Sequence, residues 1–345
     1  MGVTIFIMLN ERNSTIDVLK LFASYMVVFI HILLYGEIGV AVDALARFAV
    51  PFFLLVSGYY SYKLPLIKIK KRIRHTFSLL AFTCVLYVFW KVAPRLIEGD
   101  FVGIQQYFER YLEVETIVKL VCFNVPVSSE HIWYLFSLLY VYFALYLATK
   151  CDVSEKKIFI ISFTLLFLNL FMGEFLSIFE VTVPVFIIRN FALFGIPLFG
   201  IGIFIKKHED SIKNIPNYLV VICLTVGIIE TLFSRLFVGK NELYVGSLFI
   251  LFAIVVIFLK YPYIQYPKFI MALTNCSTYI YILHIFVSSV LAKSYQLLGF
   301  DYQTSTIIKI VHPLLICLFS TISAYGINYF IFKFNAIKKK KTKEE

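Results

Sequence analysis

The first strongly apolar segment of the chain carries a lysine and a histidine at a spacing that suits acid–base chemistry. Lys20 and His31 lie eleven residues apart in IDVLKLFASYMVVFIHI, which on an α-helix is about three turns along one face and about 16 Å of rise. Lys20 could neutralise a phosphate, and a neutral imidazole deeper in the helix could take a proton from a hydroxyl. His31 is therefore our candidate general base; the alternative is a histidine that hydrogen-bonds a neighbouring helix.

Basic side chains also stand at the second and third apolar segments. Arg47 lies at the start of the second, where it either serves a site or extends its charge to the lipid headgroups. The sequence KIKKRIRHTF opens the third, and its Arg72, Arg74 and His75 fit an anion or phosphate site at a helix N-terminus. The positive-inside rule predicts the same cluster without any function.

Charged groups mark three later apolar segments. Glu130 and His131 open one of them beside Trp133, where an aromatic belt explains the tryptophan but not the acid or the histidine. Arg189 and Glu230 lie inside the next two charge-bearing segments. These two residues either serve a functional site or form a buried ion pair with each other, because a charge without a counterion is costly in hydrocarbon.

The segment STYIYILHIF supplies a further mid-helix histidine, His284, with Tyr281 one turn before it. Each ionisable group inside an apolar segment needs a partner, a water-filled cavity or a function. This chain contains too many of them for a passive bundle, so we expect several to converge on one site.

Membrane helices are needed to position these groups. Of the 345 residues, 60% are hydrophobic and only 15% are charged, and the mean hydropathy is +0.85, whereas soluble domains carry about 25% charged residues. Apolar runs of about 18 residues or more can cross a bilayer. We predict an all-α polytopic membrane protein with about ten spans, at 16–36, 44–62, 76–93, 132–149, 157–178, 183–205, 217–235, 243–260, 271–295 and 305–332.

The positive charges predict the orientation of these spans. Most of the 32 Lys and Arg residues fall in segments that share one side if both termini are cytoplasmic, so we predict N-in, C-in. The net charge of +11 then reflects the inner loops, and we expect no nucleic-acid partner. We predict one transmembrane domain over residues 1–345, with an outer loop at 94–130 that holds an interfacial helix and a basic cytoplasmic tail at 334–345.

The six cysteines occur singly, mostly inside apolar runs, and form no C-x-x-C pair or His/Cys cluster. We therefore predict neither a disulfide framework nor a metal site. The N-terminus has no basic region before an apolar core and no small-residue cleavage site, so we expect the first helix to be retained.

In these segments the chain resembles acyltransferase family 3, the integral-membrane O-acyltransferases that modify bacterial surface polysaccharides and related acceptors. The resemblance runs from about Asn13 to Lys333. No one motif is diagnostic, and the order and spacing together carry it. Besides the first segment, the motifs are RFAVPFFLLVSGYY, KKRIRHTF, HIWYLFSLLY, RNFALFGIPLFGIG and YIYILH.

The resemblance implies that His31 is catalytic and that acyl-CoA, expected to be acetyl-CoA, is a cytoplasmic co-substrate. An Arg usually stands eleven positions before the family's histidine, where this chain has Lys20. The family's paired arginines map onto Arg72 with Arg74 or His75. The acceptor would be a hydroxyl of a cell-surface polysaccharide or of a small molecule, and the expected acceptor-side residues are Arg47, Glu130, His131, Arg189, Glu230 and Tyr281.

A second function stays open at this point. The same membrane fold occurs in membrane-bound serine racemases, where it is associated with moving L-serine across the membrane, and Arg189 with Glu230 could bind the carboxylate and ammonium of an amino acid. In either case we expect a multi-pass protein in the bilayer of the bacterial cytoplasmic membrane, with a homodimer as one candidate assembly.

Overall fold

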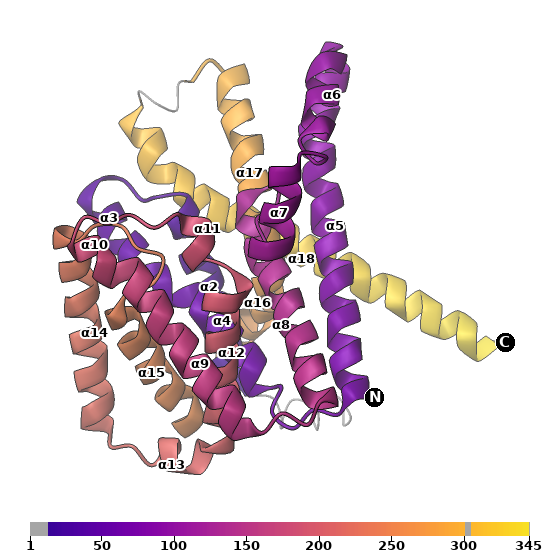
Figure 1. The fold of residues 1–345 in the computed structure, drawn as a ribbon. Helices are drawn as coiled ribbons and strands as arrows, with labels where there is room; N and C mark the ends of the chain where they lie inside the picture. Colours follow the sequence, from indigo (N-terminus) through magenta and orange to yellow (C-terminus); the bar gives the residue numbers. More distant parts are fainter. Residues whose placement is uncertain (1–12, 301–304, 345) are drawn as a thin grey trace. The chain divides into compact units, whose positions relative to one another are not determined.

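The computed structural model describes residues 13–300 and 305–344, with side chains as far as residue 334 in the last helix. The regular structure of these residues is helical, without a strand (Figure 1). The all-α polytopic class is therefore confirmed, whereas the N-in, C-in orientation stays a prediction. Within the described residues, eight helical stretches are long and apolar enough to cross a membrane: Ser14–His31, Gly36–Tyr59, Leu66–Glu98, Glu130–Lys150, Glu155–Ile178, Asn217–Phe237, Lys268–Leu297 and Thr306–Phe334.

Two of the ten predicted spans do not reach this length. The span predicted at 243–260 corresponds to α15 (Val245–Lys260), which has 16 residues and covers about 24 Å. The span predicted at 183–205 is divided around Asn190. Its parts are α11 (Val185–Ile188), η4 (Phe191–Gly195) and α12 (Ile196–Lys207).

The side chain of Asn190 explains this division. Its oxygen accepts hydrogen bonds from the backbone N–H groups of Ala192 and Leu193, both at 2.9 Å, as an N-cap does. Its amide nitrogen donates to the carbonyl oxygen of Phe186 at 3.2 Å. One side chain thus ends α11 and begins η4, which hydropathy averaged over the segment does not detect.

The chain divides into two compact units, which we describe separately. Unit 1 comprises the described residues of Met1–Ala49, Lys213–Thr225 and Phe249–Glu345; unit 2 comprises Val50–Ile212 and Val226–Leu248. The helices α14 (Asn217–Phe237) and α15 contribute residues to both. The assignment of the chain to one domain stays a prediction.

Unit 1 is built around its first helix, α2. This helix packs against every other helix that lies wholly within the unit. Asn13 begins α2: its side-chain oxygen accepts from the N–H of Ile16 at 2.9 Å, and its amide donates to the carbonyl of Phe258 at 3.1 Å. The start of α2 is thereby tied to the end of α15. The helices are α2 (Ser14–His31), α3 (Gly36–Leu45), η1 (Ala46–Phe48), α16 (Lys268–Leu273), η5 (Thr274–Cys276), α17 (Ser277–Leu297) and α18 (Thr306–Glu344).

Unit 2 is built around α12, whose glycines let its neighbours approach closely. A Cβ on Gly202 would lie 2.0 Å from the carbonyl oxygen of Leu55, and one on Gly58 would lie 1.9 Å from that of Phe199. Helix α12 and the helix that holds Gly58 therefore cross backbone against backbone. The other helices of this unit are α4 (Ala49–Tyr59), α5 (Leu66–Glu98), α6 (Phe101–Glu109), α7 (Val114–Phe123), η2 (Glu130–Ile132), α8 (Trp133–Lys150), α9 (Glu155–Leu170), η3 (Phe171–Phe175), α10 (Leu176–Ile178), α11 and η4, with α13 (Glu209–Lys213) after α12.

The predicted outer loop at 94–130 contains more helix than expected. Helix α5 continues through Pro94 and ends at Gly99, a left-handed C-cap with φ +73°. Its 33 residues span about 50 Å, more than the roughly 30 Å of a hydrocarbon core, so α5 extends beyond the core. Two helices follow in place of one, α6 and α7, and neither buries a residue. Their position at a membrane surface stays a prediction.

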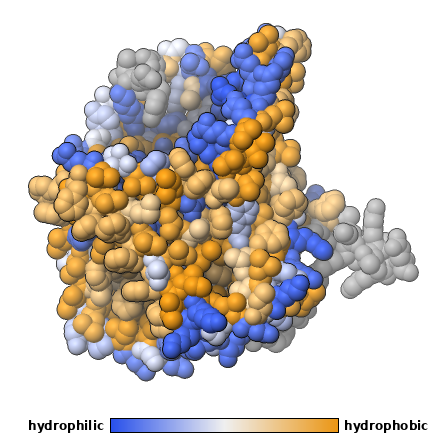
Figure 2. Space-filling model, viewed as in Figure 1, coloured by the Kyte–Doolittle hydropathy of each residue, from blue (hydrophilic) through white to orange (hydrophobic). Residues whose placement is uncertain are grey.

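Apolar side chains cover most of the visible surface over α9 and α14 (Figure 2). Phe163 and Phe167 of α9 are 61% and 63% exposed, and Ile229 of α14 is 63% exposed. A surface of this kind is costly in water and favourable against lipid tails. It therefore agrees with the membrane location that the composition predicts.

We expect Gly58→Ala to lower the thermal midpoint of the purified protein in detergent. The added Cβ would collide with a backbone oxygen that no rotamer change can move, and overpacking of this kind costs about 1–3 kcal/mol. The matched control is Gly326→Ala in α18, because a Cβ there meets nothing within 4 Å. Equal midpoints for the two variants would contradict the close crossing.

Candidate functional site

The two histidines singled out in the membrane segments of unit 1 lie against each other. The rings of His31 in α2 and His284 in α17 have centroids 5.3 Å apart and planes inclined by 35°. His284 is fully buried at mid-helix, as predicted, whereas His31 is exposed. The contact gives an accessible imidazole a rigid neighbour on another helix.

His31 is the last residue of α2, so the prediction that it lies deep inside a helix over 16–36 is wrong. The chain turns back after α2: Gly36 has φ +70°, and a Cβ on Gly39 would lie 1.8 Å from the carbonyl oxygen of Leu34. This tight turn ends α2 and starts α3. It also leaves the exposed His31 imidazole at a helix end.

His284 is oriented by its own helix. Its Nδ1 lies 2.7 Å from the carbonyl oxygen of Tyr281. Because a carbonyl only accepts, Nδ1 must carry the hydrogen of this bond. Tyr281 is itself buried, and its ring centroid lies 6.2 Å from that of His284. The structure thus brings Tyr281, His284 and His31 together in unit 1.

Arg47 is buried in η1 and forms an ion pair with Asp43 of α3 at 2.8 Å. The two side chains are 4% and 1% exposed, so the alternative in which Arg47 extends to the headgroups is wrong. Asp43 was not singled out from the sequence, although its position one turn before Arg47 is the spacing of a helical ion pair. This pair stiffens the segment that packs on α2.

Lys20 lies on the middle of α2, with its Nζ 4.0 Å from the carboxylate of Asp17. The Lys20 side chain is 30% exposed and that of Asp17 is 8% exposed. The carboxylate reduces the local positive charge, yet Lys20 keeps enough exposure to meet an anion.

In unit 2, Arg72 is directed toward the protein. Its guanidinium donates to Ser61 Oγ at 2.9 Å and to the carbonyl oxygens of Tyr60 at 2.8 Å and Ser57 at 3.3 Å. It also lies over the ring of Tyr142, 5.9 Å from the centroid. Arg72 therefore ties the start of α5 to the end of α4 and to α8.

Arg74 and His75 are exposed and do not join Arg72. Successive residues of a helix are rotated by about 100°, so Arg74, two positions on, points away from the Arg72 face. His75, three positions on, is nearer to that face, but its side chain is exposed while that of Arg72 is directed toward the protein. The structure confirms that the basic cluster lies in the first turns of a helix, because α5 begins at Leu66 after Pro65. It does not bring the expected two basic side chains together.

Arg189 forms ion pairs with two carboxylates in unit 2. It contacts Glu130, and its Nη1 lies 3.5 Å from Glu242. Its guanidinium also stacks over Trp133, 5.4 Å from the ring centroid. The alternative pairing of Arg189 with Glu230 is therefore wrong. Glu242, which is only 17% exposed, was missed because it stands outside the predicted spans.

Glu130 and His131 are neighbours in sequence but point to different places. Glu130 is 74% exposed at the Arg189 cluster. His131 is 2% exposed; its Nδ1 lies 2.8 Å from Ser129 Oγ, and its ring meets Tyr87 of α5 edge to face at 4.9 Å. The structure thus joins Glu130 with Arg189 and separates His131 from them.

Glu230 lies with a second carboxylate, Glu174, at the start of α15. Glu174 accepts from the N–H of Val245 at 2.7 Å, and Glu230 accepts from the N–H of Gly246. Both also contact the hydroxyl of Ser234. These acids satisfy the first N–H groups of α15, which would otherwise be unpaired in a membrane segment.

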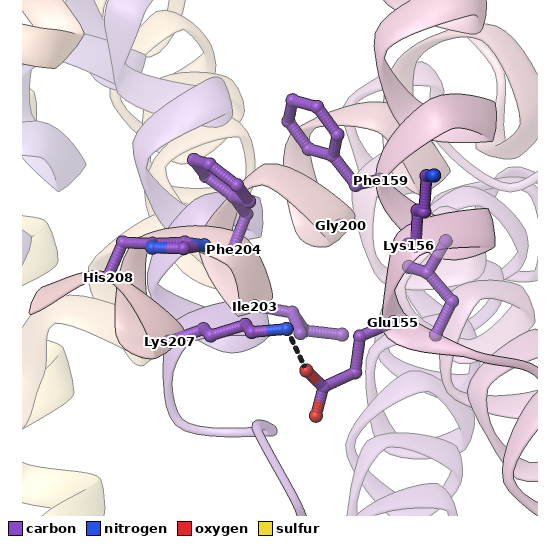
Figure 3. Close-up of a pocket in the computed structure, with 9 residues that line it drawn as sticks. Glu155, Lys156, Phe159, Gly200, Ile203, Phe204, Lys207 and His208 are labelled. Carbon is purple, nitrogen blue, oxygen red and sulfur yellow. Dashed lines mark ion pairs between the residues drawn. The ribbon is translucent and has the colours of Figure 1, made fainter.

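A cavity of about 280 Å³ lies between α9 and α12 of unit 2 (Figure 3). Its wall includes the stacked rings of Phe159 and Phe204, with centroids 4.3 Å apart. At one side Lys207 and Glu155 form an ion pair at 2.6 Å, and this hydrogen bond raises the pKa of Lys207. None of the residues predicted to act in chemistry lines this cavity, and the charges of Glu155 and Lys207 neutralise each other.

All six cysteines are free thiols. Among residues 13–300 and 305–334, no three His, Cys, Asp or Glu side chains gather in a way that could hold a metal ion.

Residues 13–332 match a protein-family model described as an acyltransferase domain. The match begins at the residue that caps α2 and ends within α18, so it includes every candidate residue described above. Neither a curated protein nor a solved structure matches the chain.

Asp43→Asn should strongly destabilise the protein, because it removes the carboxylate from a guanidinium that is 4% exposed. Breaking a buried pair costs about 3–5 kcal/mol. We expect the double variant Asp43→Leu/Arg47→Met, which removes both charges, to recover much of this loss. Thermal midpoints in detergent measure the effect.

The matched control is Glu115→Gln in α7, which removes one partner of an exposed pair with Lys119. Exposed pairs contribute little to stability, so its midpoint should not change. If Asp43→Asn and Glu115→Gln shifted the thermal midpoint equally, burial of the Arg47 pair would not add to the stability of the protein.

Proposed function

This chain belongs to the acyltransferase family whose domain it matches, and we propose that it moves an acyl group, acetyl first among them, from acyl-CoA to a hydroxyl. The acceptor would be a cell-surface polysaccharide or a small hydroxyl compound. The membership and the apolar helices make the protein a membrane acyltransferase. The donor, the acceptor, the bacterial cytoplasmic membrane and a homodimeric assembly are parts of the proposal.

The observation that carries the proposal is the accessible imidazole of His31 at the end of α2, packed on the buried ring of His284. A general base has to be reachable by the proton donor and held in position. The turn after α2 supplies the access, and His284 supplies the support. Within unit 1, His31 combines these two properties on the helix that also carries Lys20.

In the proposed reaction His31 takes the proton of the acceptor hydroxyl as its oxygen attacks the acyl carbonyl carbon. The bond between the acyl carbon and the CoA sulfur breaks, and the thiolate is protonated to the free thiol. General-base catalysis of this kind contributes about 10²–10⁴-fold to a rate. Acyl-CoA is consumed as a co-substrate and is not a resident cofactor.

In unit 1 the donor phosphates would meet Lys20, whose side chain is 30% exposed. In unit 2, Arg74 and His75 are exposed basic side chains of the kind that binds an anion. Arg72 would act differently, because its guanidinium is engaged by backbone carbonyls and Ser61. We propose that Arg72 holds α4 and α5 in the arrangement that presents the basic face.

Within unit 2, the charged cluster is a candidate for binding hydroxyl compounds, because Arg189 and the exposed Glu130 present a donor and an acceptor of hydrogen bonds. Hydroxyl-rich compounds are recognised by such paired groups. In the transport alternative Arg189 and Glu230 could bind the two ends of an amino acid, and the structure gives each of them different partners.

We expect His31→Ala to reduce acyl transfer about 10²–10⁴-fold and to change the thermal midpoint little, because the side chain is exposed even though it packs on the His284 ring. The assay follows release of free CoA from acetyl-CoA in the presence of acceptor extracts. His208→Ala is the control histidine and should retain activity. Full activity of His31→Ala, or L-serine uptake into vesicles without binding of CoA, would contradict the proposal.

Lys20→Ala should raise the KM for acetyl-CoA about tenfold, as expected for the loss of one charge-assisted contact to phosphate. Lys20→Arg should keep or lower it, since the guanidinium can bind two phosphate oxygens at once. Lys150→Ala, at the end of α8, is the control for loss of a lysine. An unchanged KM in Lys20→Ala would remove Lys20 from the donor site.

A further inference from the structure

A serine, a histidine and a tyrosine meet between α17 and α18 of unit 1. Ser288 Oγ lies 3.4 Å from Nε2 of His312, and Nδ1 of the same ring lies 3.3 Å from the hydroxyl of Tyr295. His312 is only 3% exposed, whereas Ser288 and Tyr295 are half-buried. The histidine is therefore fixed inside the protein while the serine stays accessible.

This order of groups is that of an activated nucleophile. The hydroxyl of Ser288 faces one ring nitrogen, and a third group orients the ring through the other nitrogen. If Nδ1–H donates to the Tyr295 oxygen, Nε2 is left as the acceptor for the serine proton. Distances of 3.3–3.4 Å are long for such bonds, as is common before a substrate binds.

The neighbouring serines of α17 behave differently. Ser289 donates to the carbonyl of Ile285 at 2.9 Å, and Ser294 donates to that of Val290 at 3.0 Å. Such bonds are the usual way for a serine to satisfy its hydroxyl within a helix. Ser288 is turned to a histidine of another helix instead, so helix formation alone does not account for its position.

The cluster also lies close to the proposed transfer site. Ser288 follows His284 by four residues on α17, which places it on the same helix face about 6 Å further along the axis. His284 in turn packs on His31. One helix of unit 1 therefore carries both the support of the proposed base and a candidate nucleophile.

We propose that Ser288 carries the acyl group as an ester between donor and acceptor, so that the acceptor hydroxyl attacks this ester in place of the thioester of acyl-CoA. His312 is the base for Ser288 and Tyr295 is a positioning residue; this rests on the proposed acyltransferase function. Ser288 gives its proton to His312 as its oxygen bonds to the acyl carbon. The carbon–sulfur bond breaks, and the CoA thiolate takes that proton. In the second step the acceptor hydroxyl loses its proton to His31 and displaces Ser288, whose oxygen recovers the proton.

The test uses the full-length protein with acetyl-CoA and no acceptor. After acid quenching and digestion, mass spectrometry should find one acetyl group on the peptide that contains Ser288, and addition of acceptor before quenching should remove it. Ser288→Ala should lose the label and at least 100-fold of the transfer rate. Ser289→Ala, the matched neighbour, should keep both.

Two further variants separate chemistry from folding. His312→Gln should slow labelling while binding of acetyl-CoA persists. Tyr295→Phe should lower kcat about tenfold and leave the KM for acetyl-CoA unchanged, and a merely structural role would not produce this split. Turnover by the wild-type protein without labelling of Ser288, or full activity of Ser288→Ala, would overturn the acyl-serine proposal and leave the proposed acyltransferase function standing. Absence of both CoA binding and transfer in the wild type would overturn the proposed function as well.

Discussion

The requirement that polar groups in a membrane protein be satisfied inside the protein governs much of this structure. Arg47 is buried beside Asp43, and Arg189 is held between Glu130 and Glu242. Glu174 and Glu230 accept from the first N–H groups of α15. In each case the charge is matched by a partner from the same unit, and the partner determines how the surrounding helices begin or pack.

The same requirement explains why helix irregularities can occur in this fold. At Asn190 the helix is interrupted, and the side chain of this residue caps η4. Its oxygen accepts hydrogen bonds from the backbone N–H groups that the break leaves without a helical partner. Gly58 and Gly202 then allow α12 to approach its neighbour to backbone contact. Side-chain caps thus replace the hydrogen bonds that an unbroken helix would provide, and close packing holds the helices together.

The ends and the packing of these helices determine where the candidate functional side chains lie. The turn after α2 leaves His31 accessible, and α17 brings His284 against it. The next turn of α17 presents Ser288 to His312 of α18. Unit 1 thus contains two imidazole-centred arrangements, one at an accessible base and one at a serine. Unit 2 contains the basic first turns of α5 and the charged cluster around Arg189, which suit binding more than proton transfer.

The sequence by itself determined the all-α membrane class, the approximate positions of the apolar helices, the family resemblance and the candidate histidines, because hydropathy and residue spacing are local properties of the chain. Only the tertiary structure decided that α2 ends at His31, that Arg189 pairs with Glu242 and not Glu230, and that Ser288 meets His312. Asp43 was an intermediate case, since its spacing from Arg47 is visible in the sequence. The remaining contacts join residues far apart along the chain, and packing between helices selects among partners that a single sequence leaves equivalent.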